Sequence, residues 1–222
     1  MPPRPRPSPA PRLPSGGSSL PFPCLRPGKE EEPVRCVRHI GWGLVLFLAA
    51  LPGAAQGAEV GGVSFVDEAE VGGVRLAVRG CGVLFAFGFI RAYAACFYLP
   101  AGVPAEQALA EVPRRLEIEY FRPIAARDFG RATEAGVARN ASLAAFERLR
   151  PAIEALNALY RDVKPGDRYA LAYAPGAGTT LSLNGLPLGT VPGSEFAAAL
   201  FAIWLGDNPL DPRLKAALRG DP

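Results

Sequence analysis

Residues 83–99 form an unbroken apolar run in which Arg91 is the only charged side chain. Read with the two-residue period of a β-strand, the run places its aromatic side chains on one face and small apolar side chains on the other. Because both faces are apolar, we expect the central strand of a sheet, covered on both sides and bent at Gly88. Arg91 falls on the aromatic face, where a charge must be paired, reach solvent or contact a ligand.

The rest of the chain alternates between strand and helix patterns. Apolar–polar alternation predicts strands over residues 74–78, 114–120, 169–173, 179–183 and 188–191. Helices are predicted over residues 104–110, 125–139, 142–160 and 196–205, with a last short helix after Asp211-Pro212. Tight-turn sequences such as Asn184-Gly185 join the later strands. This order predicts an α+β domain, in which helices cover one face of a large antiparallel sheet.

The first 33 residues differ in composition from everything that follows. Eleven of the 24 prolines lie at or before Pro33. Proline at this density excludes a helix or a central strand, so residues 1–33 are expected to be a disordered proline-rich leader.

Residues 34–58 have the order of a secretory signal peptide. Arg35, Arg38 and His39 precede an apolar run over residues 40–51, and small residues follow up to Gly57. The apolar run is too short for a comfortable membrane span. We therefore expect cleavage near Gly57 and a periplasmic or secreted domain over residues 59–222, without a membrane span. Because a signal peptide starts near the N-terminus, we also expect that translation begins at residue 34 or 37, from a bacterial alternative start codon.

Charge and residue counts exclude several classes of function. Residues 1–58 carry a formal net charge of +4 and residues 59–222 one of −1, so the folded part lacks the basic surface of a nucleic-acid-binding domain. The only histidine, His39, lies in the predicted signal peptide, which excludes His-dependent nucleophilic catalysis and His-bearing zinc sites from the domain. We expect neither a metal nor a cofactor. Cys81 and Cys96 form a disulfide or stay reduced as small strand residues; the sequence leaves both open.

Several motifs together resemble the bacterial chalcone isomerase-like family. They are Gly80-Cys81-Gly82 followed by residues 89–100, then Lys164-Pro165-Gly166-Asp167, Tyr173-Ala174-Pro175-Gly176, Asn184-Gly185, and Phe196 followed by Ile203-Trp204-Leu205-Gly206. The resemblance spans residues 60–220. It implies an open-faced β-sandwich with a ligand cleft between a large antiparallel sheet and a layer of helices. Plant enzymes of this fold cyclise a chalcone without a cofactor, and other members bind fatty acids without catalysis.

The polar residues of those enzymes are mostly replaced here. The resemblance places the enzymes' threonine at Tyr93 and their helix tyrosine near Phe129. Their asparagine falls near Gly136, with Asn140 one turn further on, and their arginine falls near Leu84 or Phe85, where this chain is apolar. An apolar cleft of this kind holds a ligand but has little with which to stabilise an oxyanion.

We therefore expect a non-catalytic binder of an apolar small molecule, such as a fatty acid. The candidate cleft residues are Phe85, Phe87, Phe89, Arg91, Tyr93, Phe129 and Asn140, with Arg91 as the contact for an anion. One alternative is an intramolecular lyase of the chalcone isomerase type. Another is an interaction protein that kept the fold and filled the cleft.

Overall fold

A computed structural model describes residues 57–221. The predicted leader and nearly all of the predicted signal peptide lie outside this range. The nine strands of the described part are β1 (Ala58–Val60), β2 (Val63–Phe65), β3 (Glu68–Val71), β4 (Val74–Ala86), β5 (Ile90–Leu99), β6 (Arg114–Tyr120), β7 (Arg168–Ala174), β8 (Gly178–Leu183) and β9 (Leu186–Val191). The four α-helices are α1 (Ala126–Asn140), α2 (Leu143–Leu159), α3 (Ser194–Leu205) and α4 (Pro212–Arg219), and a single 3₁₀ turn spans Ala105–Gln107. None of these helices is long and apolar enough to cross a bilayer.

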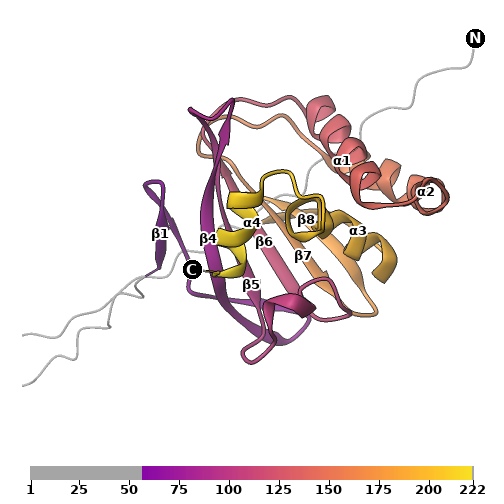
Figure 1. Cartoon of the computed structure of the whole chain (residues 1–222), viewed down its shortest axis with the longest axis horizontal. Helices are drawn as coiled ribbons and strands as arrows, with labels where there is room; N and C mark the ends of the chain where they lie inside the picture. Colours follow the sequence, from indigo (N-terminus) through magenta and orange to yellow (C-terminus); the bar gives the residue numbers. More distant parts are fainter. Residues whose placement is uncertain (1–56, 222) are drawn as a thin grey trace, which may run out of the picture. The chain divides into compact units, whose positions relative to one another are not determined.

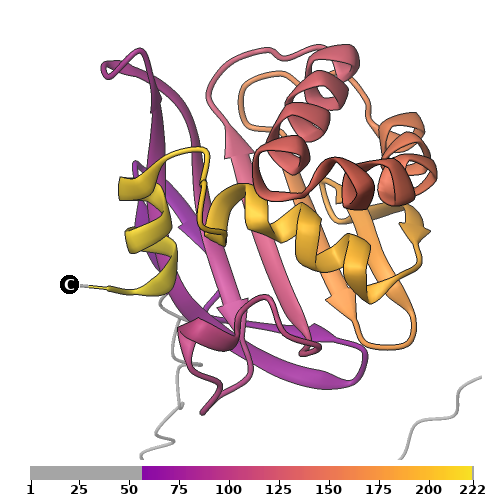
Figure 2. The same cartoon turned by 45° about the vertical axis from the view of Figure 1, so that its right-hand side comes forward.

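Strands β3 to β9 form one antiparallel sheet in which every strand pairs with its neighbours in sequence (Figure 1). The helices lie over one face of this sheet, which we call the inner face (Figure 2). This arrangement confirms the predicted α+β class and the large antiparallel sheet covered by helices. The predicted helices 125–139, 142–160 and 196–205 are present within two residues at each end, whereas 104–110 contains only the 3₁₀ turn.

Helix α3 closes the inner face. Seven of its side chains are buried, among them Phe196, Leu200 and Phe201. A helix that is apolar on nearly all sides has to be covered on nearly all sides. It therefore packs between the sheet and α1, and its Phe201 ring lies 6.3 Å from that of Phe97 on β5.

The prediction of one long strand over residues 83–99 was wrong. The chain reverses at residues 87–89, so that β4 and β5 form an antiparallel hairpin. Phe87 and Gly88 both have positive φ, of 51° and 79°, which is the conformation of a tight turn. Gly88 therefore marks a reversal and not a bend. The sequence pattern predicted one strand because the turn is made of Phe and Gly. The polar residues that usually indicate a hairpin turn are missing there.

The outer face of the sheet is partly covered by the β1–β2 hairpin. Val63 and Phe65 pack against Ala94, Cys96 and Tyr98 of β5. The side chain of Glu117 on β6 is also buried. Only 4% of its surface is exposed, and its carboxylate pairs with Arg115 at 2.7 Å and Arg168 at 3.4 Å.

The sequence left open whether Cys81 and Cys96 form a disulfide or stay reduced, and the structure joins them in a disulfide. Cys81 on β4 lies directly opposite Cys96 on β5, and the bond crosses the hairpin. The bond fixes the pairing of these two strands between two irregularities of their register, one at Arg79 and one at Ala92.

Replacing both cysteines by alanine should lower the free energy of unfolding by about 2–3 kcal/mol, the range expected for a bond that closes a loop of this length. Urea unfolding of the two proteins, followed by tryptophan fluorescence, measures the difference. A reducing agent should shift the wild-type curve by a similar amount and leave the variant in place. Identical midpoints for all samples would show that the bond does not stabilise the fold.

Candidate functional site

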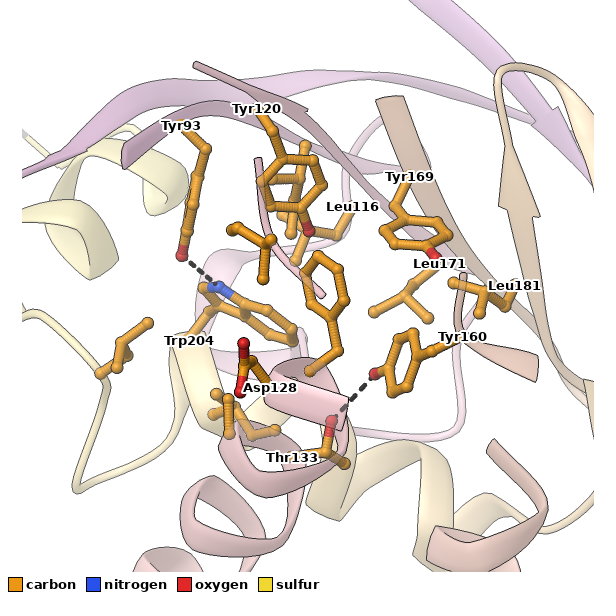
Figure 3. A pocket seen from close by; sticks show the side chains of 16 residues that line it. Tyr93, Leu116, Tyr120, Asp128, Thr133, Tyr160, Tyr169, Leu171, Leu181 and Trp204 are labelled. Carbon is orange, nitrogen blue, oxygen red and sulfur yellow. Dashed lines mark hydrogen bonds between the residues drawn. The ribbon is translucent and has the colours of Figure 1, made fainter. Parts of the chain in front are cut away.

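A cavity of about 160 Å³ lies between the inner face of the sheet and helices α1 and α3 (Figure 3). Leu116, Ile118 and Tyr120 form part of its wall, because alternate residues of β6 point to the same face. The complete lining is Tyr93, Leu116, Ile118, Tyr120, Ile124, Asp128, Phe129, Ala132, Thr133, Tyr160, Tyr169, Leu171, Leu181, Ile203, Trp204 and Leu210. Asp128 and Leu210 are both partly exposed, so the cavity opens to solvent beside them.

One side of the cavity is a cluster of four aromatic rings. Phe129 stacks on Tyr160 with ring centroids 5.3 Å apart and meets Tyr120 and Tyr169 edge-on at 5.2 Å. Edge-on and stacked pairs of this kind add stability beyond the area they bury. The cluster therefore ties α1 to strands β6 and β7 and keeps this wall in place.

Hydrogen bonds orient most of the polar atoms in the lining. Trp204 Nε1 donates to the Tyr93 hydroxyl at 2.9 Å, and the hydroxyls of Thr133 and Tyr160 are 2.9 Å apart. The Tyr169 hydroxyl donates to the carbonyl of Arg161 at 2.8 Å. Tyr93 accepts in its bond, so its own O–H remains able to donate to a ligand.

The tyrosines of the lining are neutral at physiological pH. Burial keeps them neutral to higher pH than an exposed tyrosine, because it raises the pKa of Tyr93 and of Tyr120 well above the usual value, and that of Tyr160 to about 12. Asp128 is the only charged residue of the lining, and it lies 3.6 Å from Arg131. The cavity thus offers neutral hydroxyl donors and no cation. No group of three or more potential metal ligands occurs in residues 57–221.

The structure brings two of the seven candidate cleft residues to the cavity, Tyr93 and Phe129. Phe85, Phe87 and Phe89 lie at the tip of the β4–β5 hairpin, where they are 46%, 87% and 76% exposed.

The other two candidates lie elsewhere. Arg91 donates to the carbonyl of Gly61 and its guanidinium lies 4.1 Å from the ring centroid of Phe121. Asn140, at the end of α1, donates to the carbonyl of Gly136 and exchanges two hydrogen bonds with the backbone of Asn208. Arg91 and Asn140 thus hold local structure and do not reach the cavity.

A β-bulge explains why the side chains of Arg91 and Tyr93 lie in different surroundings. Tyr93 pairs with Leu84 and Arg91 pairs with Phe85, so Ala92 is an extra residue in β5. The extra residue breaks the alternation of side chains. Tyr93 therefore joins the core beneath the helices, whereas Arg91 packs toward the β1–β2 hairpin.

Sequence reasoning missed six polar members of the lining, which are Tyr120, Asp128, Thr133, Tyr160, Tyr169 and Trp204. Trp204 lies in a helix that is apolar on nearly all sides, a pattern that indicates core packing. Tyr160 follows the last residue of α2 and falls outside its apolar repeat. Thr133 lies in α1 without any distinguishing pattern, so only the fold brings it to Tyr160.

The raised tyrosine pKa values predict a loss of stability at alkaline pH. In the unfolded chain these hydroxyls ionise near pH 10, whereas in the folded protein Tyr93, Tyr120 and Tyr160 stay protonated, so the stabilisation is complete below pH 10 and falls as pH rises further. Each contributes about 1.4 kcal/mol per pH unit. Arg114 acts in the opposite direction, because burial lowers its pKa to about 10. Urea unfolding between pH 9 and 12 should show a net decline, with phenolate absorbance appearing on unfolding; constant stability would contradict it.

The comparisons with known proteins agree with this architecture. Residues 57–220 match the sequence profile of the family described as chalcone isomerase-like. No curated protein sequence matches the chain. Among solved structures, the fold is similar to that of a fatty-acid binding protein from Arabidopsis thaliana, with a TM-score of 0.58 and 14% identity over 71% of this chain and 92% of the other. Since the profile covers about three quarters of the sequence, the chain belongs to the chalcone isomerase-like family.

Proposed function

We propose that this protein is a non-catalytic binder of an apolar small molecule, and that the cavity beneath α1 and α3 holds the ligand. The observation that carries the proposal is the lining, which is aromatic and aliphatic apart from a few placed hydroxyls and one carboxylate. Pockets for small molecules commonly combine an apolar wall with a few polar groups in this way. The likeness in fold to a fatty-acid binding protein supports a fatty acid as the class of ligand.

The size of the cavity limits how such a ligand is held. An engineered apolar cavity of about 150 Å³ accommodates benzene. The space of about 160 Å³ therefore suits a ring or a short stretch of chain. A longer chain must extend through the opening beside Asp128 and Leu210 or displace side chains of the wall.

The lining also favours binding over catalysis. Cyclisation of a chalcone requires stabilisation of a developing negative charge, which pre-placed donors and cations supply. Here the donors are neutral hydroxyls such as those of Tyr93 and Tyr120, and no lysine or arginine lines the cavity. An intramolecular lyase remains the enzymatic alternative, and it would have to work with these hydroxyls alone. The hollow of about 160 Å³ supports binding of a ligand over the third alternative, an interaction protein with a filled cleft.

Blocking the opening tests the proposal. Ala132 on α1 lines the cavity and is exposed, so Ala132→Trp should obstruct entry without disturbing the core. We expect the affinity for dodecanoic acid, measured by isothermal titration calorimetry, to fall about tenfold or more. The matched control is Ala135→Trp, an exposed position of the same helix outside the lining. Equal affinity in the two variants would place the ligand elsewhere, and no binding by the wild type would refute the proposal. A chalcone cyclisation assay on the same samples should show only the spontaneous rate.

We further propose that the domain works after export from a bacterial cell. The signal-like residues 34–58 and the Cys81–Cys96 disulfide support this, since disulfides persist in oxidising compartments. Amino-terminal sequencing of the mature protein should find a first residue between 56 and 59. A mature protein that retains residues 1–33 would contradict both the cleavage and the expected start.

A further inference from the structure

Arg114, the first residue of β6, is a buried cation without an anionic partner. Its side chain is 0% exposed, and it forms no salt bridge among residues 57–221. Nη1 donates to the carbonyls of Ala110 and Val112, whereas Nε and Nη2 have no hydrogen-bond partner. The guanidinium lies over the rings of Tyr173 and Phe201, 4.4 and 4.8 Å from their centroids. A charge in such surroundings is costly unless its donors are satisfied.

Two further residues of the inner face carry buried polar groups without partners. The Tyr173 hydroxyl and Thr179 Oγ1 make no hydrogen bond, and their residues are 1% and 0% exposed. Arg114 pairs with Tyr173 between β6 and β7, and Tyr173 pairs with Thr179 between β7 and β8. The three residues therefore form one row across three adjacent strands, on the inner face; we call them the polar triplet.

The polar triplet continues the wall of the cavity. Leu116, Leu171 and Leu181 form the neighbouring row on the same three strands, and all three line the cavity. The two rows are two residues apart on each strand, which is about 7 Å. The polar atoms thus lie one row beyond the leucines that close this end of the cavity.

The unpaired atoms match the chemistry of a carboxylate. Nε and Nη2 of an arginine lie on one edge of the guanidinium, and their parallel N–H groups form the fork that binds both oxygens of a carboxylate. The hydroxyls of Tyr173 and Thr179 supply two further donors. A carboxylate accepts about four hydrogen bonds, which equals the number of unpaired atoms in the triplet, and its charge would neutralise that of Arg114.

We propose that the polar triplet is the anion subsite of the cavity, and that it binds the carboxylate of an apolar acid. The acid enters headgroup first, the side chains of the leucine row turn aside, and the hydrocarbon chain then occupies the present cavity. This inference rests on the proposed function, and it replaces Arg91 by Arg114 as the residue that contacts the anion.

The test compares an acid with a neutral molecule of the same chain length. Calorimetry on the full chain at pH 8, where the acid is ionised, would measure the affinities for dodecanoic acid and for 1-dodecanol. The wild type should prefer the acid. Arg114→Met should weaken acid binding about tenfold or more and change alcohol binding less than about twofold. Arg75→Met, at a side chain that is 79% exposed, is the matched control and should change neither affinity.

Two variants that each remove one hydroxyl keep the inference testable if Arg114→Met does not fold. Tyr173→Phe and Thr179→Val keep the shape of the side chains, and each should weaken acid binding about threefold to tenfold with little effect on the alcohol. If the triplet only holds trapped water, all three variants will alter both affinities equally or not at all, which overturns the inference while the binding function stands. Failure of the wild type to bind either compound would instead refute the proposed function.

Discussion

The packing of α3 on the inner face of the sheet is the interaction on which the rest of the structure depends. Burial of a side chain such as Phe196, Leu200 or Phe201 stabilises the fold by about 1.5–3 kcal/mol. One end of this helix places Trp204 at Tyr93, and Phe201 lies over Arg114. Helix α3 thus covers both the cavity and the polar triplet. Any change that tilts this helix alters both.

The paired strands β6, β7 and β8 carry both the cavity wall and the polar triplet on the face that α3 covers. Because they pair without a shift over this stretch, the chemistry of the inner face changes row by row. Ile118 and Tyr169 share one row, the three leucines form the next, and the polar triplet follows. The cavity wall is accordingly aromatic near the Phe129 ring cluster and aliphatic beyond it, and the row that carries Arg114 lies outside the lining.

The sequence was a good guide where periodicity is long or turn chemistry is explicit. Helices α1, α2 and α3 followed from their repeats, and the Asn184-Gly185 turn has the positive φ angles that its residues favour. The β4–β5 hairpin did not follow, because a turn built from Phe87 and Gly88 lacks a polar signal.

The candidate site was harder to predict than the fold for two physical reasons. The bulge at Ala92 separates Arg91 from Tyr93, and the shift in alternation that it causes cannot be read in a run that is apolar on both faces. Arg114 looks like an ordinary charged residue at the start of a strand, and charged residues are rarely fully buried. Only the three-dimensional register shows that it shares a row with Tyr173 and Thr179.

The order of the strands has a consequence for how proteins of this fold can diversify. Since β6 and β7 are neighbours in the sheet, residues 121–167 are an excursion from one hairpin, and its stem is closed by the Ile124–Val163 bridge and by the bond from Tyr120 N to the Asp167 carbonyl. Exchanging this excursion would replace Phe129, Thr133 and Tyr160 together and leave every strand pairing intact. Six of the sixteen residues that line the cavity therefore belong to a replaceable segment, whereas the two that α3 supplies, Ile203 and Trp204, are fixed by the role of that helix in the core.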